Sequence, residues 1–161
     1  MTMSFSEVAD YIRSSCAPTG MTTKIIAIDG CGAAGKTTLS EKLSKLFGNC
    51  SVIHTDDFAS WDDPLNWYPR MIKQALEPLK LNKEARFQKY DWKLRSLDHW
   101  ITVQPAEFVI IEGVSSSRTE FRTYLAYSIF VHADRSLRLS RGIERDGKNT
   151  ESHWLDWMHA E

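Results

Sequence analysis

Four short hydrophobic runs recur along the chain, and each of them ends at polar or glycine residues. The runs are Lys24 to Asp29, Ser51 to Thr55, Phe108 to Ile111 and Tyr127 to Val131. Isoleucine and valine are prominent in them, and the first and third show no polar alternation. Such runs are typical of strands that are buried on both faces of a parallel sheet.

Between these runs, apolar residues recur at helical spacing. The spacing predicts helices over residues 4–15, 37–47, 63–79, 134–147 and 152–160. Ser4 and Glu7 form a capping box at the first of them, and Pro64 after Asp63 favours a helix start there. Residues 80–107 are polar and rich in aromatic residues, and they predict no clear element.

The alternation of strands and helices predicts an α/β fold with a parallel sheet and right-handed crossovers. The chain has no internal repeat, low-complexity segment or linker, so we predict a single domain over residues 1–161. The sequence stops inside the last predicted helix, which suggests a C-terminally truncated domain.

The composition argues against several classes of protein. The formal net charge is -1, which argues against binding to nucleic acid or to an anionic membrane through bulk electrostatics. No apolar run approaches the roughly 20 residues of a membrane-spanning helix. Residues 1–20 lack a basic segment followed by an apolar one, and the three cysteines are widely spaced. We expect a cytoplasmic protein without a disulfide framework or a structural metal.

A glycine-rich loop directly after the first predicted strand fits two nucleotide-binding fingerprints. It consists of Gly30, Cys31, Gly32, Ala33, Ala34, Gly35, Lys36, Thr37 and Thr38. As G-x-x-x-x-G-K-[ST] it is a P-loop for the phosphates of a nucleoside triphosphate. As G-x-G-x-x-G it is a dinucleotide-binding turn, and Asp56 supplies the acidic residue that such a site needs at the second strand.

The residues after the third glycine favour the P-loop. Lys36 would reach the outer phosphates of ATP and the Thr37 hydroxyl would hold Mg²⁺, whereas a dinucleotide site requires neither residue. The guanine-reading sequence N-K-x-D of GTPases is missing, because the string that starts at Asn82 continues Lys-Glu-Ala. We therefore expect phosphoryl transfer to a small molecule.

Acidic residues follow two of the predicted strands. Asp56 and Asp57 come after the second strand, where an open parallel sheet places its ligands. One of them is expected to accept the proton of a substrate hydroxyl and the other to support the site, and the sequence leaves open which is the base. Glu112 ends the third strand, where it would meet Mg²⁺ or its waters, because a buried carboxylate without a partner is costly.

Arginines form a stripe on the helix predicted over residues 134–147. Arg135, Arg138, Arg141 and Arg145 recur every three or four residues. A basic stripe is often only a solvated face, but arginine suits forked recognition of phosphate. Arg141 and Arg145 are the candidates for a lid that neutralises charge during transfer.

Taken together, the motifs resemble those of uridine kinases and their bacterial relatives. In chain order they are Ile-Ala-Ile-Asp-Gly with the P-loop, His54-Thr55-Asp56-Asp57-Phe58, Tyr90-Asp91-Trp92, Ile111-Glu112-Gly113-Val114 and the arginine-rich segment 138–146. The resemblance covers roughly residues 22–160. It implies a three-layer P-loop NTPase fold with strand order 2-3-1-4-5 and a lid at about residues 134–150.

The resemblance also implies roles for single residues. Asp56 resembles the base that activates the acceptor hydroxyl. Arg138, Arg141 and Arg145 resemble lid arginines, of which Arg138 is expected to bind substrate and the other two to act in catalysis. Tyr90 and Asp91 resemble parts of a nucleoside pocket. Asp57 and Trp92 complete the predicted substrate-binding residues. The implied ligands are ATP with Mg²⁺ and a small hydroxyl acceptor.

The sequence departs from uridine kinases in the acceptor region. Ala59 stands where they typically carry an aromatic residue, and the pocket segment and lid are shorter. A nucleoside monophosphate or another small metabolite is therefore an alternative acceptor. An ATP-binding regulatory module without turnover is the alternative from another class. No fifth strand follows the lid, and the edge left at residues 127–131 could bind another chain, which is compatible with a homo-oligomer but leaves the oligomeric state open.

Overall fold

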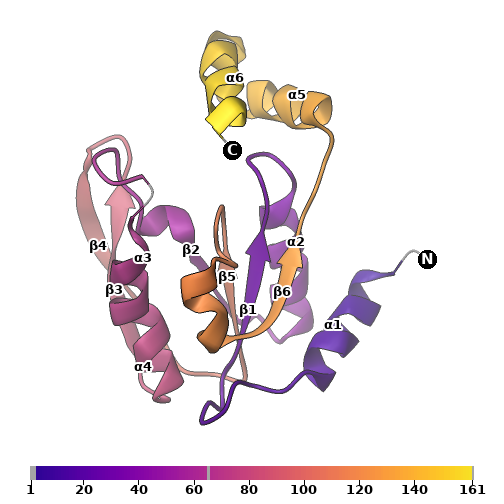
Figure 1. Ribbon diagram of the computed structural model, residues 1–161, viewed down its shortest axis with the longest axis vertical. Helices are drawn as coiled ribbons and strands as arrows, with labels where there is room; N and C mark the ends of the chain where they lie inside the picture. Colours follow the sequence, from indigo (N-terminus) through magenta and orange to yellow (C-terminus); the bar gives the residue numbers. More distant parts are fainter. Residues whose placement is uncertain (1–2, 65, 161) are drawn as a thin grey trace.

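A parallel sheet of four strands forms the centre of the protein. The computed structural model describes residues 3–64 and 66–160. The strands are β1 (Lys24–Asp29), β2 (Ser51–His54), β5 (Phe108–Glu112) and β6 (Leu125–Phe130), and their order is β2-β5-β1-β6 (Figure 1). This confirms the predicted α/β fold and the order 2-3-1-4 of its parallel strands. Within the described ranges this sheet has no fifth strand.

Layers of helix cover both faces of the sheet, which explains why the central strands are apolar throughout. Ile26 and Ile28 pack with α1 (Phe5–Ser14) and α2 (Lys36–Leu46) on one face. Ile25 and Ala27 point into a cluster on the other face. Because successive side chains of a strand alternate between the faces, both sets must be hydrophobic.

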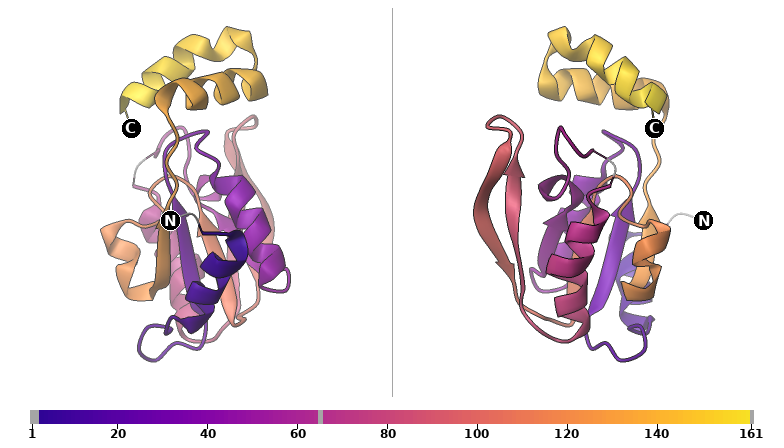
Figure 2. Two further views of the ribbon diagram at one scale, coloured as in Figure 1. Left: turned by 90° about the vertical axis from the view of Figure 1, so that its right-hand side faces the viewer. Right: turned by 60° about the vertical axis from the view of Figure 1, so that its left-hand side comes forward.

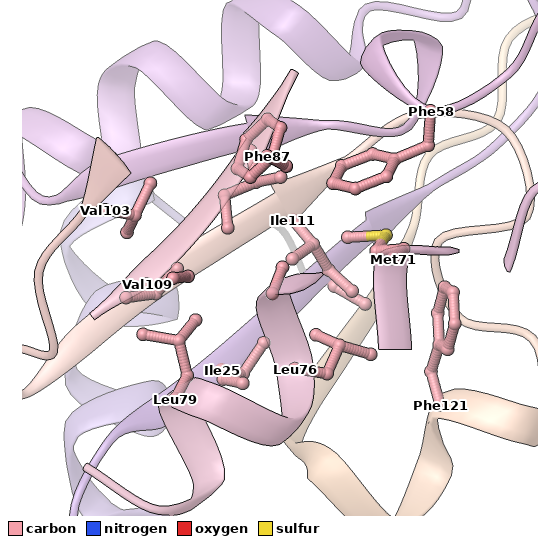
Figure 3. Packing of buried hydrophobic residues seen from close by; sticks show 14 of the residues in the cluster. Ile25, Phe58, Met71, Leu76, Leu79, Phe87, Val103, Val109, Ile111 and Phe121 are labelled. Atoms are coloured by element: carbon pink, nitrogen blue, oxygen red, sulfur yellow. The ribbon is translucent and has the colours of Figure 1, made fainter. Parts of the chain in front are cut away.

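The larger cluster lies under the second helical layer. That layer consists of α3 (Tyr68–Met71), the π turn η2 (Ile72–Leu76), α4 (Glu77–Lys80) and the 3₁₀ segment η3 (Thr119–Tyr124). Figure 3 shows Met71, Leu76, Leu79 and Phe121 from this layer against strand residues such as Ile111. The predicted capping box at Ser4 is present at the start of α1.

The prediction that a helix begins at Asp63-Pro64 was wrong. The helical segment begins at Tyr68, with Pro69 in its first turn. Asp63 forms a turn instead, because its Oδ1 accepts a hydrogen bond of 2.8 Å from the backbone N–H of Asn66. Further along, Pro78 has no N–H to donate to the preceding turn, and the π turn lies directly before it.

The segment that predicted no clear element forms a β-hairpin. Its strands are β3 (Ala85–Asp91) and β4 (Ser96–Val103), which pair antiparallel with a shift in register between Gln88 and Tyr90. The hairpin stands beside the main sheet (Figure 2), and β3 contacts η2 and the 3₁₀ turn η1 (Thr55–Asp57). Val103 is the only residue of β4 that is buried.

Two helices lie across the carboxyl ends of the parallel strands. They are α5 (Arg135–Asp146) and α6 (Glu151–Ala160), joined by the short 3₁₀ turn η4 (Lys148–Thr150), and they lie at the top of Figure 1. Gly142 allows the pair to pack, since a Cβ there would lie 2.4 Å from the ring of Trp154. No helix of the described residues is both long and apolar enough to cross a membrane.

Candidate active site

A cleft of about 1290 Å³ lies between the carboxyl ends of the strands and the helix pair α5–α6. Most of the predicted site residues line it. These are Gly32, Ala33, Ala34, Gly35, Lys36, Thr37, Thr38, Asp56, Asp57, Trp92, Glu112, Arg141 and Arg145. The cleft lining does not include Gly30, Cys31, Tyr90, Asp91 or Arg138. The fold therefore brings the phosphate, metal and lid candidates together, but only part of the predicted acceptor pocket.

The P-loop has the geometry of an anion site. Gly35 is left-handed (φ 106°) at the N-cap of α2, and no side chain caps this helix. The first N–H groups of α2 thus remain available, and the helix dipole adds positive potential. Lys36 is buried at the start of the helix, where its Nζ donates a hydrogen bond of 2.9 Å to the backbone carbonyl of Cys31.

Gly30 lies outside the cleft lining and has a structural role. Its φ is 142°, and a Cβ at this position would lie 2.2 Å from the carbonyl oxygen of Val131. Only glycine fits where the chain leaving β1 passes so close to the chain leaving β6. The first glycine of the motif therefore shapes the loop, and its contact with ATP stays a prediction.

Asp29, which was not among the predicted site residues, supports the loop from below. Its Oδ1 accepts hydrogen bonds from the backbone N–H groups of Gly30 (2.7 Å) and Ser115 (2.9 Å). Its Oδ2 accepts from the N–H (2.9 Å) and Oγ (2.6 Å) of Ser117. The carboxylate therefore joins the P-loop to the segment after β5. Its position at the end of a buried strand was the available signal, because a buried carboxylate requires partners.

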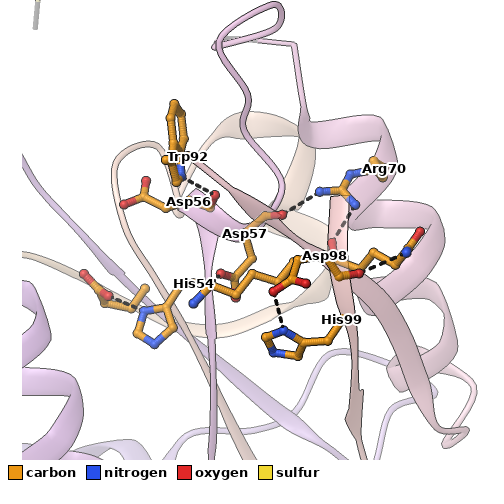
Figure 4. Close-up of polar contacts among 10 residues, drawn as sticks. His54, Asp56, Asp57, Arg70, Trp92, Asp98 and His99 are labelled. Carbon is orange, nitrogen blue, oxygen red and sulfur yellow. Dashed lines mark hydrogen bonds and ion pairs between the residues drawn. The ribbon is translucent and has the colours of Figure 1, made fainter. Parts of the chain in front are cut away.

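Glu112 lies at the end of β5 with only 6% of its surface exposed. Its Oε2 lies 2.8 Å from Nδ1 of His54, the residue opposite it on β2 (Figure 4). This hydrogen bond is the main reason why the pKa of His54 is raised, and the nearby carboxylates add to it. His54 belongs to the motif His54-Thr55-Asp56-Asp57-Phe58, but its residue type and position predicted no role for it.

Asp56 and Asp57 occupy the turn η1, which packs closely against the end of β5. A Cβ on Gly113 would lie 1.9 Å from Oγ1 of Thr55, so this glycine is required for the turn to pack there. Asp56 is exposed to the cleft but has protein on most sides. Burial is the main cause that raises its pKa, Glu112 adds to it, and the positive charge of Lys36 opposes it.

Asp57 is buried, and its contacts are with neighbouring segments of the protein. Its Oδ1 lies 3.6 Å from Nζ of Lys89, at the point where the β3 ladder shifts register. The guanidinium of Arg70 donates hydrogen bonds to the backbone carbonyls of Asp57 (2.6 Å) and Gln88 (2.9 Å), which ties η1 to the hairpin. These contacts favour Asp56 as the base and Asp57 as the supporting residue.

The hairpin brings only Trp92 of its three predicted site residues to the cleft. The Trp92 Nε1 donates a hydrogen bond of 3.2 Å to the backbone carbonyl of Asp56. Asp91 Oδ1 accepts from the N–H groups of Lys93 and Leu94, both at 2.8 Å, and these bonds lower the pKa of Asp91. Tyr90 is buried with its ring against Trp92. The structure thus gives Tyr90 and Asp91 structural surroundings, and their contact with an acceptor stays a prediction.

The three lid arginines differ in their surroundings. Arg138 is buried, and its Nη1 donates a 3.3 Å hydrogen bond to the P-loop carbonyl of Gly32. Arg145 pairs with Asp146 through Nε (2.7 Å) and Nη2 (2.9 Å), which raises the pKa of Arg145 and lowers that of Asp146. Arg141 and Arg145 line the cleft. Arg138 therefore connects α5 to the loop, while the other two face the ligand space.

The cleft offers oxygen donors of the kind that magnesium binds. No group of three or more His, Cys, Asp or Glu side chains suited to a metal occurs among the described residues. Magnesium needs no such cage in a nucleotide site, because it binds through one or two protein oxygens, substrate phosphates and water. Thr37 and Glu112 line the same cleft and offer a hydroxyl and a carboxylate.

Comparison with curated proteins identifies kinases among the relatives. No protein-family model matches the chain. It is 28% identical over 144 residues to a uridine kinase of Chlamydia pneumoniae, a match that covers 78% of this chain and 65% of the relative. It is 26% identical over 148 residues to a uridine kinase of Borrelia duttonii, which covers 80% and 72%. An inorganic pyrophosphatase of Arabidopsis thaliana, TTM2, is 31% identical over 142 residues, but the match covers 79% of this chain and only 21% of that protein.

Solved structures share the fold. A possible uridine kinase from Bacillus stearothermophilus superposes with a TM-score of 0.67, at 18% identity, over 94% of this chain and 90% of the other. A putative fructose transport system kinase from Silicibacter sp. TM1040 gives a TM-score of 0.70, at 18% identity, over 96% and 83%. At this identity the likeness concerns the arrangement of strands and helices.

Proposed function

Because the chain belongs to the uridine kinase-like family of P-loop kinases, we propose that it transfers the γ-phosphoryl group of ATP to a hydroxyl group of a small molecule. The observation that carries the proposal is the shared cleft. It joins Lys36 of the P-loop, Asp56, Glu112 and two lid arginines at the carboxyl ends of the strands.

The P-loop side of the cleft would hold the triphosphate. The N–H groups at the start of α2 and the buried ammonium of Lys36 provide positive charge there. To bind a phosphate oxygen, Lys36 exchanges its hydrogen bond with the carbonyl of Cys31 for a bond to ATP. Arg141 and Arg145 stabilise the negative charge on the transferring group from the opposite side.

The residues that would hold Mg²⁺ are Thr37 and Glu112. The ion would supply positive charge next to the phosphates and lower the cost of moving the phosphoryl group. The Thr37 hydroxyl would contribute a neutral oxygen ligand, and the Glu112 carboxylate would bind the ion or its waters.

Asp56 would act as the general base. Its carboxylate accepts the proton of the acceptor hydroxyl as the hydroxyl oxygen bonds to the γ-phosphorus and the bond from that phosphorus to the β–γ bridging oxygen breaks. The products are the phosphorylated acceptor and ADP. The raised pKa of Asp56 brings it closer to the pKa of an effective base at neutral pH.

We propose a nucleoside as the acceptor. Uridine kinases recur among the relatives, and Trp92 supplies an aromatic surface in the cleft beside Asp56. The chain spans 65% of the length of the Chlamydia relative and about a fifth of the plant one, so the acceptor is proposed for this cleft and not transferred from those proteins. A nucleoside monophosphate or another hydroxyl metabolite is the alternative acceptor.

A coupled assay of ADP release tests the function. Wild-type protein with ATP and Mg²⁺ is screened against nucleosides, nucleoside monophosphates and small sugars, with Asp56→Asn as the control. At least one nucleoside should stimulate ADP release in the wild type and not in the variant. If ATP binds and no acceptor of any class stimulates release, the chain is an ATP-binding module without turnover.

A further inference from the structure

A histidine next to the proposed metal ligand has no role in the mechanism above. His54 ends β2 and lies directly opposite Glu112 in the register of the parallel strands. Its Nδ1 forms the 2.8 Å hydrogen bond to Glu112 Oε2 that Figure 4 shows. Both residues line the cleft. The contact is thus set by strand pairing and not by a mobile loop.

This contact leaves the two oxygens of Glu112 in different environments. Oε2 is engaged by His54, while Oε1 accepts no hydrogen bond within the part of the chain that the structure describes. A buried carboxylate with one fixed oxygen has a defined orientation, since rotation about its last bond would break the hydrogen bond. Such outer contacts orient ligand groups and tune metal affinity in known metal sites.

The cations near this carboxylate have other contacts. The Nζ of Lys36 is bonded to the carbonyl of Cys31 at 2.9 Å, and the Nζ of Lys89 lies near Asp57 at 3.6 Å. Among the described residues, His54 is therefore the side chain that fixes Glu112.

We propose that His54 is a positioning residue that holds Glu112 so that its second oxygen faces the Mg²⁺ of the bound nucleotide. The inference rests on the proposed function, because it takes Glu112 as part of the metal site. His54 itself contacts neither ATP nor the metal. By holding Glu112, His54 strengthens the preference of the cleft for ATP with bound Mg²⁺ over ATP without it.

The experiment compares two substitutions at the same position. His54→Leu removes the donor and keeps a side chain of moderate size, whereas His54→Asn keeps an amide N–H close to the place of Nδ1. His99→Leu is the matched control, because the Nδ1 of His99 also lies 2.8 Å from a carboxylate, that of Asp98, on the exposed hairpin. Calorimetry measures ATP affinity with Mg²⁺ and with EDTA, and the ratio of the two reports the contribution of the metal.

We expect His54→Leu to lower this ratio about tenfold, as loss of an outer contact does in other metal sites, with the affinity in EDTA unchanged. His54→Asn should recover most of the loss, and His99→Leu should match the wild type. In the background of Glu112→Gln, His54→Leu should have no further effect on the ratio.

Three results would overturn the proposal. They are an unchanged ratio in His54→Leu, an equally lowered ratio in His54→Asn, or a loss of ATP affinity in His54→Leu that is as large with EDTA as with Mg²⁺. If His54→Leu does not fold, His54→Asn provides the test. An Asn variant that folds but has a lowered ratio of ATP affinity with Mg²⁺ to ATP affinity with EDTA contradicts positioning. Failure of the kinase proposal is distinct, since it shows in the wild type as an absence of ATP binding or of transfer.

Discussion

The two halves of the cleft are built in different ways. The half proposed for phosphate comes from one continuous stretch, residues 32–38, and the buried carboxylate of Asp29 joins the start of this loop to the segment after β5. The acceptor half is assembled from η1, from Arg70 and from the β3–β4 hairpin, which are distant in the sequence. Backbone N–H groups dominate the first half, and side chains dominate the second.

This difference indicates which part of the cleft would determine the phosphoryl donor and which part would determine specificity for the acceptor. A phosphate site made of backbone groups tolerates many side chains, provided that the glycines and Lys36 are kept. An acceptor site made of side chains changes its ligand whenever one of them is replaced. The fold can therefore keep the same phosphoryl donor while the acceptor varies, and the predictions below separate the two halves.

The largest effect is expected in the acceptor half from Asp56→Asn. Loss of the base should lower kcat by about 10²–10⁴-fold, the range of general base catalysis. ATP affinity should be unchanged, because the asparagine amide is similar in size and lies outside the P-loop. Steady-state kinetics and calorimetry together check both statements. A variant with wild-type kcat would remove Asp56 from the mechanism.

In the phosphate half, Lys36→Met should lower kcat by about 10²–10³-fold, as loss of one charge-stabilising donor does in other enzymes. The methionine preserves the length of the side chain but removes its charge. Lys45→Met, on the exposed side of the same helix, is the matched control and should retain full activity. Equal activities of the two variants would contradict the P-loop assignment.

Stability should depend on Asp29 more than on any residue of the acceptor half. Asp29→Asn replaces an acceptor of four hydrogen bonds with an amide that cannot accept them all, so we expect a loss of about 2–3 kcal/mol in the free energy of unfolding. Urea denaturation measures it. Asp10→Asn, at an exposed ion pair on α1, should change this free energy by less than about 1 kcal/mol. Similar losses in both variants would show that Asp29 does not brace the loop.

A smaller effect is expected from Trp92→Ala, which removes an aromatic wall of the acceptor half. The KM for the acceptor should rise about tenfold, the equivalent of one aromatic contact of roughly 1.4 kcal/mol, while the KM for ATP should not change. Trp100→Ala, on the exposed face of the same hairpin, is the control. A rise in the KM for ATP alone would place Trp92 on the donor side.

The smallest effect is expected in the pH dependence of kcat, which Asp56 should set. Burial and the negative charge of Glu112 raise the pKa of Asp56, and Asp57 adds to this, whereas Lys36 and His54 oppose it. The base must be ionised, so kcat should fall as the pH drops through the raised pKa of Asp56. The midpoint should lie above that of an exposed aspartate. A profile that stays flat down to the usual range of Asp would contradict the raised pKa of Asp56.

The sequence predicted the strand, loop and helix that place residues 30–38, because their signal is local, while the phosphate contacts of this loop stay a prediction. A glycine loop between a buried strand and a helix carries its own geometry, and Glu112 follows from its place at the end of a strand. The hairpin was not predicted, because β4 is exposed over most of its length and has no buried face to impose alternation. The helix start at Asp63 was misplaced because Asp-Pro also suits a turn, and the Asp63 carboxylate accepts a hydrogen bond from Asn66 in such a turn.

Distant partners explain why Asp29 and His54 had no predicted role. The roles of Asp29 and His54 depend on partners 58 or more positions away, namely Glu112 for His54 and the segment after β5 for Asp29. Only the strand order brings these partners together. Their residue types were suggestive, but the pairing that gives each a function required the fold.

The most direct test of the account follows the phosphoryl group itself. Protein is mixed with Mg²⁺, a pool of nucleosides and ATP that carries a radioactive γ-phosphate, and the products are separated by chromatography. The account predicts that the label moves to an organic acceptor with the wild type and stays in ATP with Asp56→Asn. Label that remains in ATP, or that is released only as inorganic phosphate, would contradict phosphoryl transfer by this cleft.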